Sequence, residues 1–342
     1  MQRFNFTKAA SIAIDLGNSN TILGNKTHDI ASQPSYIVFN SPDKTVRAVG
    51  QEAYDMAGKT NHNLKVIKPL KGGVIKDYES ASQMLKALVR HSYPGRAFFY
   101  RFDYIVSGVP YSSTEVERRA LRDTLAQFSA SKTYLLFEPI AAAIGMGIDI
   151  HCPDGVFIVD IGGGITETAV ISLSGIVTFS SIRTAGDAFD IDIQEYIRKK
   201  YKIDVSLTVA EKVKINVGTA SQFLENEPEP FYAVGKDSVL GMPKGVYIEY
   251  QEIVEVLNSS IQKIEQVIFQ TLEECPPELA GDIYGSGIYL TGGGSLLKGL
   301  KERLINRIGI PVHSDPNALL SVTRGIQTVI ANPKKYQAVL LK

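Results

Sequence analysis

The sequence is poor in cysteine and has no excess charge of either sign. Its 342 residues include two cysteines, Cys152 and Cys275, which lie far apart and form no C-x-x-C pair, so a reducing compartment fits. The 36 basic and 36 acidic side chains balance, which argues against nucleic acid as a partner. Because a neutral chain repels itself little, this balance also permits self-association.

Long apolar runs and the commonest phosphate-binding motif are absent as well. No stretch of 18 apolar residues occurs, so we expect no transmembrane helix. The first residues, MQRFNFTKAAS, lack the apolar region of a signal peptide, and we therefore expect a cytoplasmic location. No GxxxxGK[ST] P-loop occurs.

The chain is long enough for two domains, each with its own hydrophobic core. Strand and helix patterns alternate, which predicts β-sheets covered by helices. We expect strands at 11–16, 21–24, 35–39, 46–49, 103–109, 133–137, 156–160, 167–173, 176–182 and 287–291, and helices at 50–57, 79–91, 114–128, 139–147, 187–201, 208–217, 251–273 and 296–307.

The segment FIVDIGGGITETAVISL places Asp160 and then Gly162, Gly163 and Gly164 between two apolar runs. One glycine is enough for a turn, and each extra one costs about 0.5–1 kcal/mol, so three indicate close approach of a ligand to the backbone. N–H groups in such a turn form an anion nest, and an aspartate before it holds a hard cation directly or through water. A simple tight hairpin is the alternative.

A second segment follows the same plan, and a third contains another glycine cluster. SIAIDLGNSNTILG contains a strand, Asp15, and the polar turn Gly17, Asn18, Ser19 and Asn20. The two aspartates are about 145 residues apart, too far for a solenoid, which favours an ancient duplication. In GIYLTGGGSLLKGL a strand runs into the glycines 292–294 and then a predicted amphipathic helix, the general arrangement of a nucleotide site.

The ordered segments DLGNSNT, FEPIAAAIG, DIGGGITE, AGDAFD, AEKVKINVG and LTGGGSLLKGL resemble the actin/Hsp70/sugar-kinase superfamily. Within it, VERRALRDT, CPPELAGDI and GKTNHNLKVIKPLKGGVIKDY are similar to the MreB family of bacterial actins, and the similarity covers roughly residues 11–330. The resemblance implies an actin-like (ribonuclease H-like) α/β fold, with two duplicated domains around a nucleotide cleft. Domain I is expected at 1–152 and 317–342, with a small subdomain at 40–72, and domain II at 153–316, with a small subdomain at 189–250.

The resemblance also implies a site for ATP or ADP with Mg²⁺. Asp15 and Asp160 would order Mg²⁺ and its waters, and Glu138 would position the attacking water. The other nucleotide contacts that it implies are Gly17, Asn18, Ser19 and Asn20 on one side of the phosphates, Gly162, Gly163 and Gly164 on the other, Gly186 and Asp187 at a helix start near them, Glu211 and Lys214 at the ribose and purine, and Gly292, Gly293, Gly294 and Ser295 beneath the adenosine.

Simpler roles remain open for three of these residues. Glu138 also fits as an acid at a helix N-terminus, where the helix dipole favours it. Glu211 and Lys214 lie at i and i+3 on one helix face and also fit a surface ion pair. Two departures from the family pattern concern turnover more than binding: Ile165 stands where many relatives have Thr, and Phe137 where many have a second Glu.

The resemblance implies a slow ATPase that polymerises into cytoskeletal filaments. These would lie at the inner face of the cell membrane, contact membrane proteins of the cell-wall elongation machinery, and set cell shape. Membrane contact is expected through Phe98 and Phe99 of GRAFFYRF, with Phe4 and Phe6 as a second contact; packing of these rings on the core is the alternative. A nucleotide-binding scaffold with little or no hydrolysis remains an alternative function. A chaperone would need a further domain, and a sugar kinase an insertion with a catalytic Asp.

Overall fold

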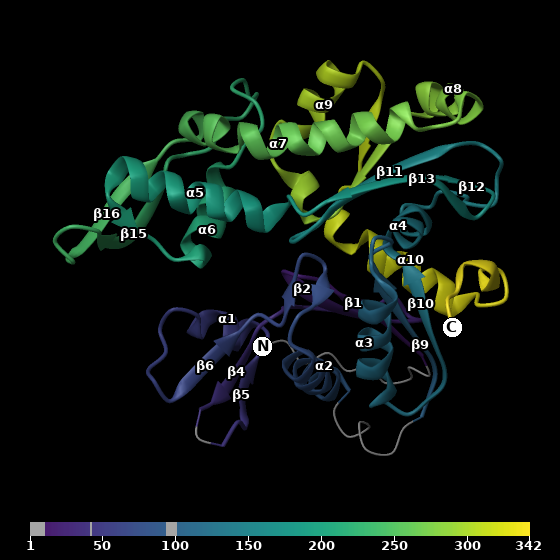
Figure 1. Ribbon diagram of the computed structural model, residues 1–342, viewed down its shortest axis with the longest axis horizontal. Helices are drawn as coiled ribbons and strands as arrows, with labels where there is room; N and C mark the ends of the chain where they lie inside the picture. Colours follow the sequence, from purple (N-terminus) through teal and green to yellow (C-terminus); the bar gives the residue numbers. More distant parts are fainter. Residues whose placement is uncertain (1–10, 42, 94–100) are drawn as a thin grey trace. The chain divides into compact units, whose positions relative to one another are not determined.

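The computed structural model describes residues 11–41, 43–93 and 101–342, and these separate into two compact units (Figure 1). Unit 1 comprises the chain up to Asp154 together with Ile171–Val177 and Leu319–Lys342. Unit 2 comprises Gly155–Val170 and Thr178–Ala318. The domain borders expected at 152/153 and 316/317, and the two small subdomains, stay predictions; the division differs from them in placing Ile171–Val177 with unit 1.

Unit 1 is built on a five-stranded sheet with the order β10-β9-β1-β2-β3. Strands β1, β9 and β10 are parallel, whereas β1, β2 and β3 form antiparallel pairs. The strands are β1 Ser11–Leu16, β2 Asn20–Asn25, β3 Ile30–Pro34, β9 Phe102–Val109 and β10 Ala130–Phe137. Ile12, Ile14 and Ile105 are among the fully buried side chains of this core, as expected for strands with both faces covered.

Among the described residues of unit 1, the remaining elements are four longer helices, a small sheet with its own short helix, and a short hairpin. The helices are α2 Tyr78–Ser92, α3 Glu115–Ala126, α4 Glu138–Gly145 and α10 Ser321–Ala331. Helix α1, Gln51–Met56, contacts a sheet of order β5-β4-β6, made of β4 Ile37–Asn40, β5 Val46–Val49 and β6 Leu64–Ile67; the hairpin is β7 Leu70–Lys71 with β8 Val74–Ile75, and η3 Gln337–Val339 lies near the C-terminus.

Helices α4 and α10 cross at unusually close range. A Cβ atom built on Gly325 of α10 would lie 1.7 Å from the carbonyl oxygen of Ala141, and one built on Gly145 of α4 would lie 1.8 Å from that of Ser321. Neither helix can carry a larger residue at its glycine without moving apart from the other. Since Glu138 is the first residue of α4, this crossing also fixes the position of its backbone.

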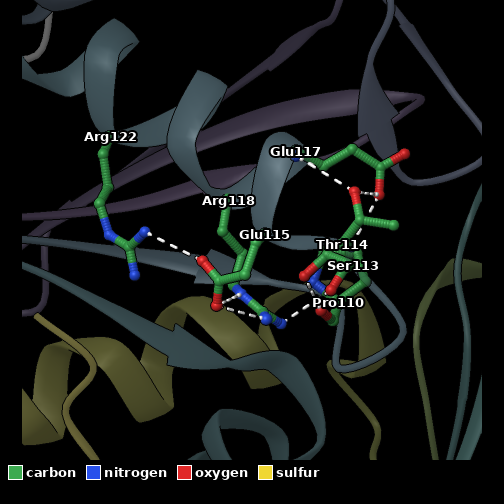
Figure 2. Close-up of polar contacts among 7 residues, drawn as sticks. All are labelled: Pro110, Ser113, Thr114, Glu115, Glu117, Arg118 and Arg122. Atoms are coloured by element: carbon green, nitrogen blue, oxygen red, sulfur yellow. Dashed lines mark hydrogen bonds and ion pairs between the residues drawn. The ribbon is translucent and has the colours of Figure 1, made fainter.

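Helix α3 begins at a complete capping box (Figure 2). The backbone N–H of Glu117 donates to the Thr114 hydroxyl at 3.3 Å, and the Thr114 N–H donates to the Glu117 carboxylate at 2.9 Å. Arg118 donates to the carbonyl of Ser113 at 2.7 Å, and the Ser113 hydroxyl donates to the Pro110 carbonyl at 2.6 Å. The first two bonds satisfy N–H groups at the start of the helix, and the other two bind carbonyls of the segment that precedes it.

Unit 2 repeats the plan of unit 1. Its main sheet has the order β13-β12-β11-β17-β18, so that three strands consecutive in sequence again continue into two parallel ones. The strands are β11 Val156–Ile161, β12 Thr166–Ser172, β13 Gly175–Ile182, β17 Ile288–Thr291 and β18 Val312–Ser314. The shared order agrees with the duplicated α/β architecture that the two Asp–Gly hairpins predicted.

A second sheet and five helices complete unit 2. Figure 1 shows the hairpin of β15 and β16 beside α5 and α6, and β14 joins it to form the order β14-β15-β16. The elements are α5 Gly186–Tyr201, β14 Ile203–Asp204, α6 Leu207–Val217, β15 Phe231–Asp237, β16 Pro243–Ile248, α7 Tyr250–Glu273, α8 Pro277–Ser286, η1 Gly293–Leu296 and α9 Leu300–Ile308; η2, Ala318–Leu320, leads back to unit 1.

The predicted helix at 296–307 is wrong at its start. After Gly292 the chain forms the 3-10 turn η1, and α9 begins only at Leu300. The break falls at Gly299, whose φ of +71° is a left-handed conformation that favours glycine. Among the described helices, none is both long and apolar enough to span a bilayer.

Candidate functional site

The turn between β1 and β2 is tightly closed. The Gly17 N–H donates to the carbonyl of Asn20 at 3.0 Å, and a Cβ on Gly17 would lie 2.7 Å from the same oxygen. Ser35 holds the turn in place: its hydroxyl donates to the Gly17 carbonyl at 2.6 Å and its N–H to the Ser19 carbonyl at 2.9 Å. No feature of the sequence indicated that Ser35, which follows β3, supports this turn.

The other two expected residues of this hairpin are Asp15 and Asn18. Burial raises the pKa of Asp15 to about 7, against the opposing effect of a hydrogen bond from the Thr323 hydroxyl at 3.5 Å. A nearby cation favours the charged form of a carboxyl, so a half-buried oxygen ligand of this kind fits a hard cation such as Mg²⁺. The Asn18 side chain accepts a hydrogen bond from the Gly73 N–H at 3.4 Å, which connects the turn to the β7–β8 hairpin.

Glu138 lies in a pocket within unit 1. The lining residues are Leu16, Leu70, Gly73, Val74, Ile75, Gly108, Val109, Pro110, Ser113, Glu117, Leu121 and Glu138. Glu138 is also the acidic residue in the first turn of α4. Its position therefore accommodates both the expected role beside a ligand and the simpler role at a helix N-terminus.

Phe137, the departure next to Glu138, is accommodated by aromatic contacts. Its ring meets the edge of Tyr111, with centroids 4.7 Å apart and planes at 70°. The Arg118 guanidinium lies 6.0 Å from the centroid of the same ring. The Phe137 ring thus packs against Tyr111 and Arg118 at the position where many relatives have a second Glu. This chain keeps the neighbouring carboxylate, Glu138.

The triple-glycine turn of unit 2 is attached to the N-terminus of α5. The Gly162 N–H donates to the Ile165 carbonyl at 3.0 Å and closes the turn. The carbonyl of Gly162 accepts from the Gly186 N–H at 3.2 Å, and that of Gly163 accepts from the Asp187 N–H at 2.7 Å. The structure therefore brings together two motifs, DIGGGITE and AGDAFD, that were expected at the same phosphates.

The third glycine cluster lies against the end of β11. A Cβ on Gly292 would lie 2.2 Å from Oδ1 of Asp160, and one on Gly294 would lie 2.4 Å from the Ile161 side chain. The Ser295 hydroxyl donates to the Gly292 carbonyl at 2.7 Å. Close approach to β11 is thus a reason for these glycines that the sequence did not reveal; their expected contact with adenosine stays a prediction.

Lys214 reaches from α6 to the start of α5. Its Nζ lies 2.8 Å from Oδ1 of Asp190 and donates to the Gly186 carbonyl at 3.1 Å. The side chains of Lys214 and Asp190 are only 18% and 10% exposed, so this is a largely buried pair and not a surface one. Burial raises the pKa of Asp190 to about 6; Lys214 opposes the shift and Glu211 adds to it. Asp190 was missed as a site residue although it is the last residue of AGDAFD.

The expected membrane contacts and the expected metal site stay predictions. Phe4, Phe6, Phe98 and Phe99 lie outside the described residues. Across residues 11–41, 43–93 and 101–342, no group of three or more His, Cys, Asp or Glu side chains gathers that could hold a metal ion.

The main sheets of the two units have the same strand order, and each carries an aspartate and a glycine turn on its central hairpin. This arrangement defines an actin-like fold. The crystal structure of MreB5 of Spiroplasma citri bound to AMPPNP matches with a TM-score of 0.88 at 34% identity, covering 96% of this chain and 98% of that one. A MamK double helical filament shares the fold, with a TM-score of 0.76 at 20% identity, covering 94% of this chain and 98% of that one.

The chain belongs to the MreB/Mbl family. The model of that family, described as MreB/Mbl protein, matches residues 9–338. The cell shape-determining protein Mbl of Bacillus subtilis (strain 168) is 38% identical over 328 residues, 96% of this chain and 97% of the relative. The cell shape-determining protein MreB of Escherichia coli (strain K12) is 37% identical over 331 residues, 95% and 94% of the two chains. The family resemblance stated from the sequence is confirmed.

Proposed function

We propose that the protein is an ATP-dependent, actin-like cytoskeletal protein that binds ATP and ADP with Mg²⁺. The observation that carries this proposal is the repeated hairpin: Asp15 and Asp160 precede tightly closed glycine turns on the central hairpins of two sheets with the same strand order. Family relatives support it, since MreB5 of Spiroplasma citri was solved bound to AMPPNP and to ADP.

In this proposal the two hairpins bind opposite sides of one polyphosphate. Asp15 and Asp160 hold Mg²⁺ through its waters, in keeping with the preference of that ion for one or two carboxylates together with phosphate oxygens. Backbone N–H groups of the two turns would bind phosphate, except those of Gly17 and Gly162, which close the turns. Mg²⁺ held there would supply positive charge against the negative charge of phosphoryl transfer. Lys214 and Glu211 contact the ribose and base, and the segment Gly292–Ser295 lies beneath the adenosine.

Hydrolysis is proposed to be slow. Glu138 accepts a hydrogen bond from the attacking water and orients it. Ile165 follows the triple glycine without a hydroxyl that could hold a second bond to that water, so Glu138 acts alone. The second candidate, a nucleotide-binding scaffold with little or no turnover, rests on the same absence of a hydroxyl.

We further propose that the protein polymerises into filaments at the inner face of the cell membrane and organises cell-wall synthesis. The names of the curated relatives, cell shape-determining proteins, support a role in cell shape. Phe98 and Phe99, with Phe4 and Phe6, are the proposed membrane contacts, and burying one Phe contributes only about 1.5–3 kcal/mol. Repetition of a weak contact along a filament makes attachment firm, so assembly and membrane binding are coupled.

The test of the nucleotide site is Asp160→Ala, with Asp160→Asn as the variant that preserves shape. Both should abolish phosphate release and weaken Mg²⁺·ATP binding at least tenfold, about 1.4 kcal/mol, in calorimetric titrations. The difference from wild type should shrink when EDTA removes Mg²⁺.

Asp123→Ala is the matched control. Asp123 is exposed on α3, and its ion pair with Arg119 is long, at 4.0 Å, so removing it should have little effect. It should leave both affinity and turnover at wild-type values. Unchanged ATP affinity and turnover in the Asp160 variants would refute the assignment of Asp160 to the metal and phosphate site.

A further inference from the structure

Hydrogen bonds connect Lys214 of α6, through the start of α5, to the triple-glycine turn. Helices α5 and α6 lie side by side in unit 2 (Figure 1). Nζ of Lys214 donates to the Gly186 carbonyl at 3.1 Å. The next N–H along α5, that of Asp187, donates to the Gly163 carbonyl at 2.7 Å. The side chain expected at the ribose and base is thus linked to the turn expected at the phosphates.

The geometry of the peptide group makes these bonds continuous. In a trans peptide the C=O and the N–H point in opposite directions. Lys214 binds the carbonyl of the 186–187 peptide, so the N–H of that peptide, on Asp187, points towards the Gly163 carbonyl. This carbonyl belongs to the 163–164 peptide, whose N–H, on Gly164, therefore points away from α5.

The turn itself leaves two N–H groups for a ligand. Gly163 and Gly164 lie between β11 and β12, and among the described residues neither N–H donates to a backbone carbonyl. The bond from the Gly186 N–H to the Gly162 carbonyl orients the N–H of Gly163 in the same way. Neighbouring N–H groups outside a helix form an anion nest, and a cation at one end of a hydrogen-bonded chain polarises the bonds that follow.

Asp190 holds the ammonium group in place. It lies four residues after Gly186 on α5, and its Oδ1 is 2.8 Å from Nζ of Lys214. Both side chains are largely buried. Without the carboxylate, the ammonium would be a buried cation that has lost its counter-charge, which is strongly unfavourable. Lys214 would then turn towards water and release the Gly186 carbonyl.

We propose that Asp190 and Lys214 are positioning residues that orient the phosphate-binding N–H groups of Gly163 and Gly164. The inference rests on the nucleotide site proposed above and adds a second role for Lys214 beside its contact with ribose and base. The two roles differ in what they affect. A contact with ribose or base contributes equally to the binding of adenosine and of ADP, whereas orientation of the turn contributes only to ligands that carry phosphate.

The test compares the affinities of ADP and adenosine for the full chain with Mg²⁺ present. Calorimetric titration measures ADP, and competition in the same titration measures adenosine. Lys214→Met removes the ammonium but keeps the apolar stem, and it should weaken ADP about tenfold more than adenosine, or roughly 1.4 kcal/mol. Asp190→Asn should shift the ratio of the two affinities in the same direction by a smaller factor. The double variant should bind ADP no more weakly than Lys214→Met alone, because both changes break one chain of bonds.

Lys244→Met is the matched control. Nζ of Lys244 also binds an aspartate and a backbone carbonyl, with Asp237 at 3.0 Å and the Tyr201 carbonyl at 3.1 Å. Lys244 and Asp237 lie on β16 and β15, away from the glycine turn. This variant should bind both ligands as wild type does.

The outcomes separate this inference from the proposed function. If Lys214→Met and Asp190→Asn weaken ADP and adenosine by the same factor, the inference is overturned while the nucleotide site stands. Additive effects in the double variant would show that Asp190 does not act through Lys214, which also overturns it. If wild type binds neither ligand, the proposed function and this inference both fail. Should circular dichroism show that Lys214→Met is unfolded, the same ratio in Asp190→Asn, which preserves shape, decides.

Discussion

Replacing Gly325 by alanine tests the close crossing of α4 and α10. Helix propensity alone predicts that this change stabilises α10 by about 1 kcal/mol, because glycine is a poor helix residue. The structure predicts the opposite, since the new Cβ would lie 1.7 Å from the Ala141 carbonyl oxygen and 2.6 Å from its carbon. Carbon and oxygen atoms in weak contact are about 3.3 Å apart, so the helices would have to separate by roughly 1.5 Å.

The magnitudes decide which effect dominates. Forcing an extra methyl into a packed interior costs typically 1–3 kcal/mol, and here the obstacle is backbone that cannot rotate away, so about 3 kcal/mol is appropriate. Subtracting the propensity gain leaves a net loss of about 2 kcal/mol in the free energy of unfolding. Because Glu138 begins α4, displacement of this helix should also lower the rate of phosphate release.

Urea-induced unfolding of nucleotide-free protein, followed by circular dichroism, measures the effect. Gly281→Ala is the matched control: it makes the same change in the interior of α8, where an added Cβ meets nothing within 4 Å. It should be neutral or stabilising by up to about 1 kcal/mol. A Gly325→Ala protein as stable as wild type would show that α4 and α10 do not cross as closely as described.

Three further predictions concern turnover, the membrane and pH. Ile165→Thr should raise phosphate release several-fold, since each 1.4 kcal/mol of barrier is about tenfold in rate, and a slower Thr variant would contradict the proposed role of the missing hydroxyl. Phe98→Ser/Phe99→Ser should reduce pelleting with liposomes without affecting polymerisation; equal pelleting would exclude this segment as the anchor. Glu252 is partly desolvated, which raises its pKa, but hydrogen bonds from Lys200, Tyr196 and Tyr201 outweigh this and hold the pKa at about 2. The contribution of Glu252 to stability is therefore complete above the ordinary pKa of 4.5 and is lost as the pH falls towards 2. The difference in Tm between wild type and Glu252→Gln should accordingly shrink between about pH 6 and about pH 3.5. A difference in Tm that stays constant over this range would refute the role of these hydrogen bonds.

The elements most easily predicted are those whose pattern is local. The expected strands at 11–16 and 156–160 correspond to β1 Ser11–Leu16 and β11 Val156–Ile161, and the expected helix at 187–201 to α5 Gly186–Tyr201. Apolar periodicity bounded by glycine and polar turns is visible in the sequence itself. Local patterns of this kind predicted β-sheets covered by helices, whereas the actin-like fold was implied by the resemblance of six ordered motifs to a known superfamily.

Helices α8 and α10 were not predicted, for a common reason. The α8 segment contains Gly281 and Gly285, and the α10 segment, SVTRGIQTVIA, combines Gly325 with β-branched residues. Both compositions disfavour an isolated helix. Burial of Val322, Ile326 and Val329 in the tertiary structure outweighs that preference in α10, and packing of this kind cannot be read from local propensity.

The sequence by itself determined the fold class, the family resemblance, and which aspartates and glycines to examine. Only the tertiary structure decided what surrounds them: the Thr323 hydroxyl at Asp15, Asp190 at Lys214, and the contact of the 292–294 segment with β11. Thr323 is 308 positions from Asp15, and Asp190 lies on a different helix from Lys214. The physical reason is that a motif is a property of neighbouring residues, whereas burial, hydrogen bonding and pKa depend on atoms that only folding brings together.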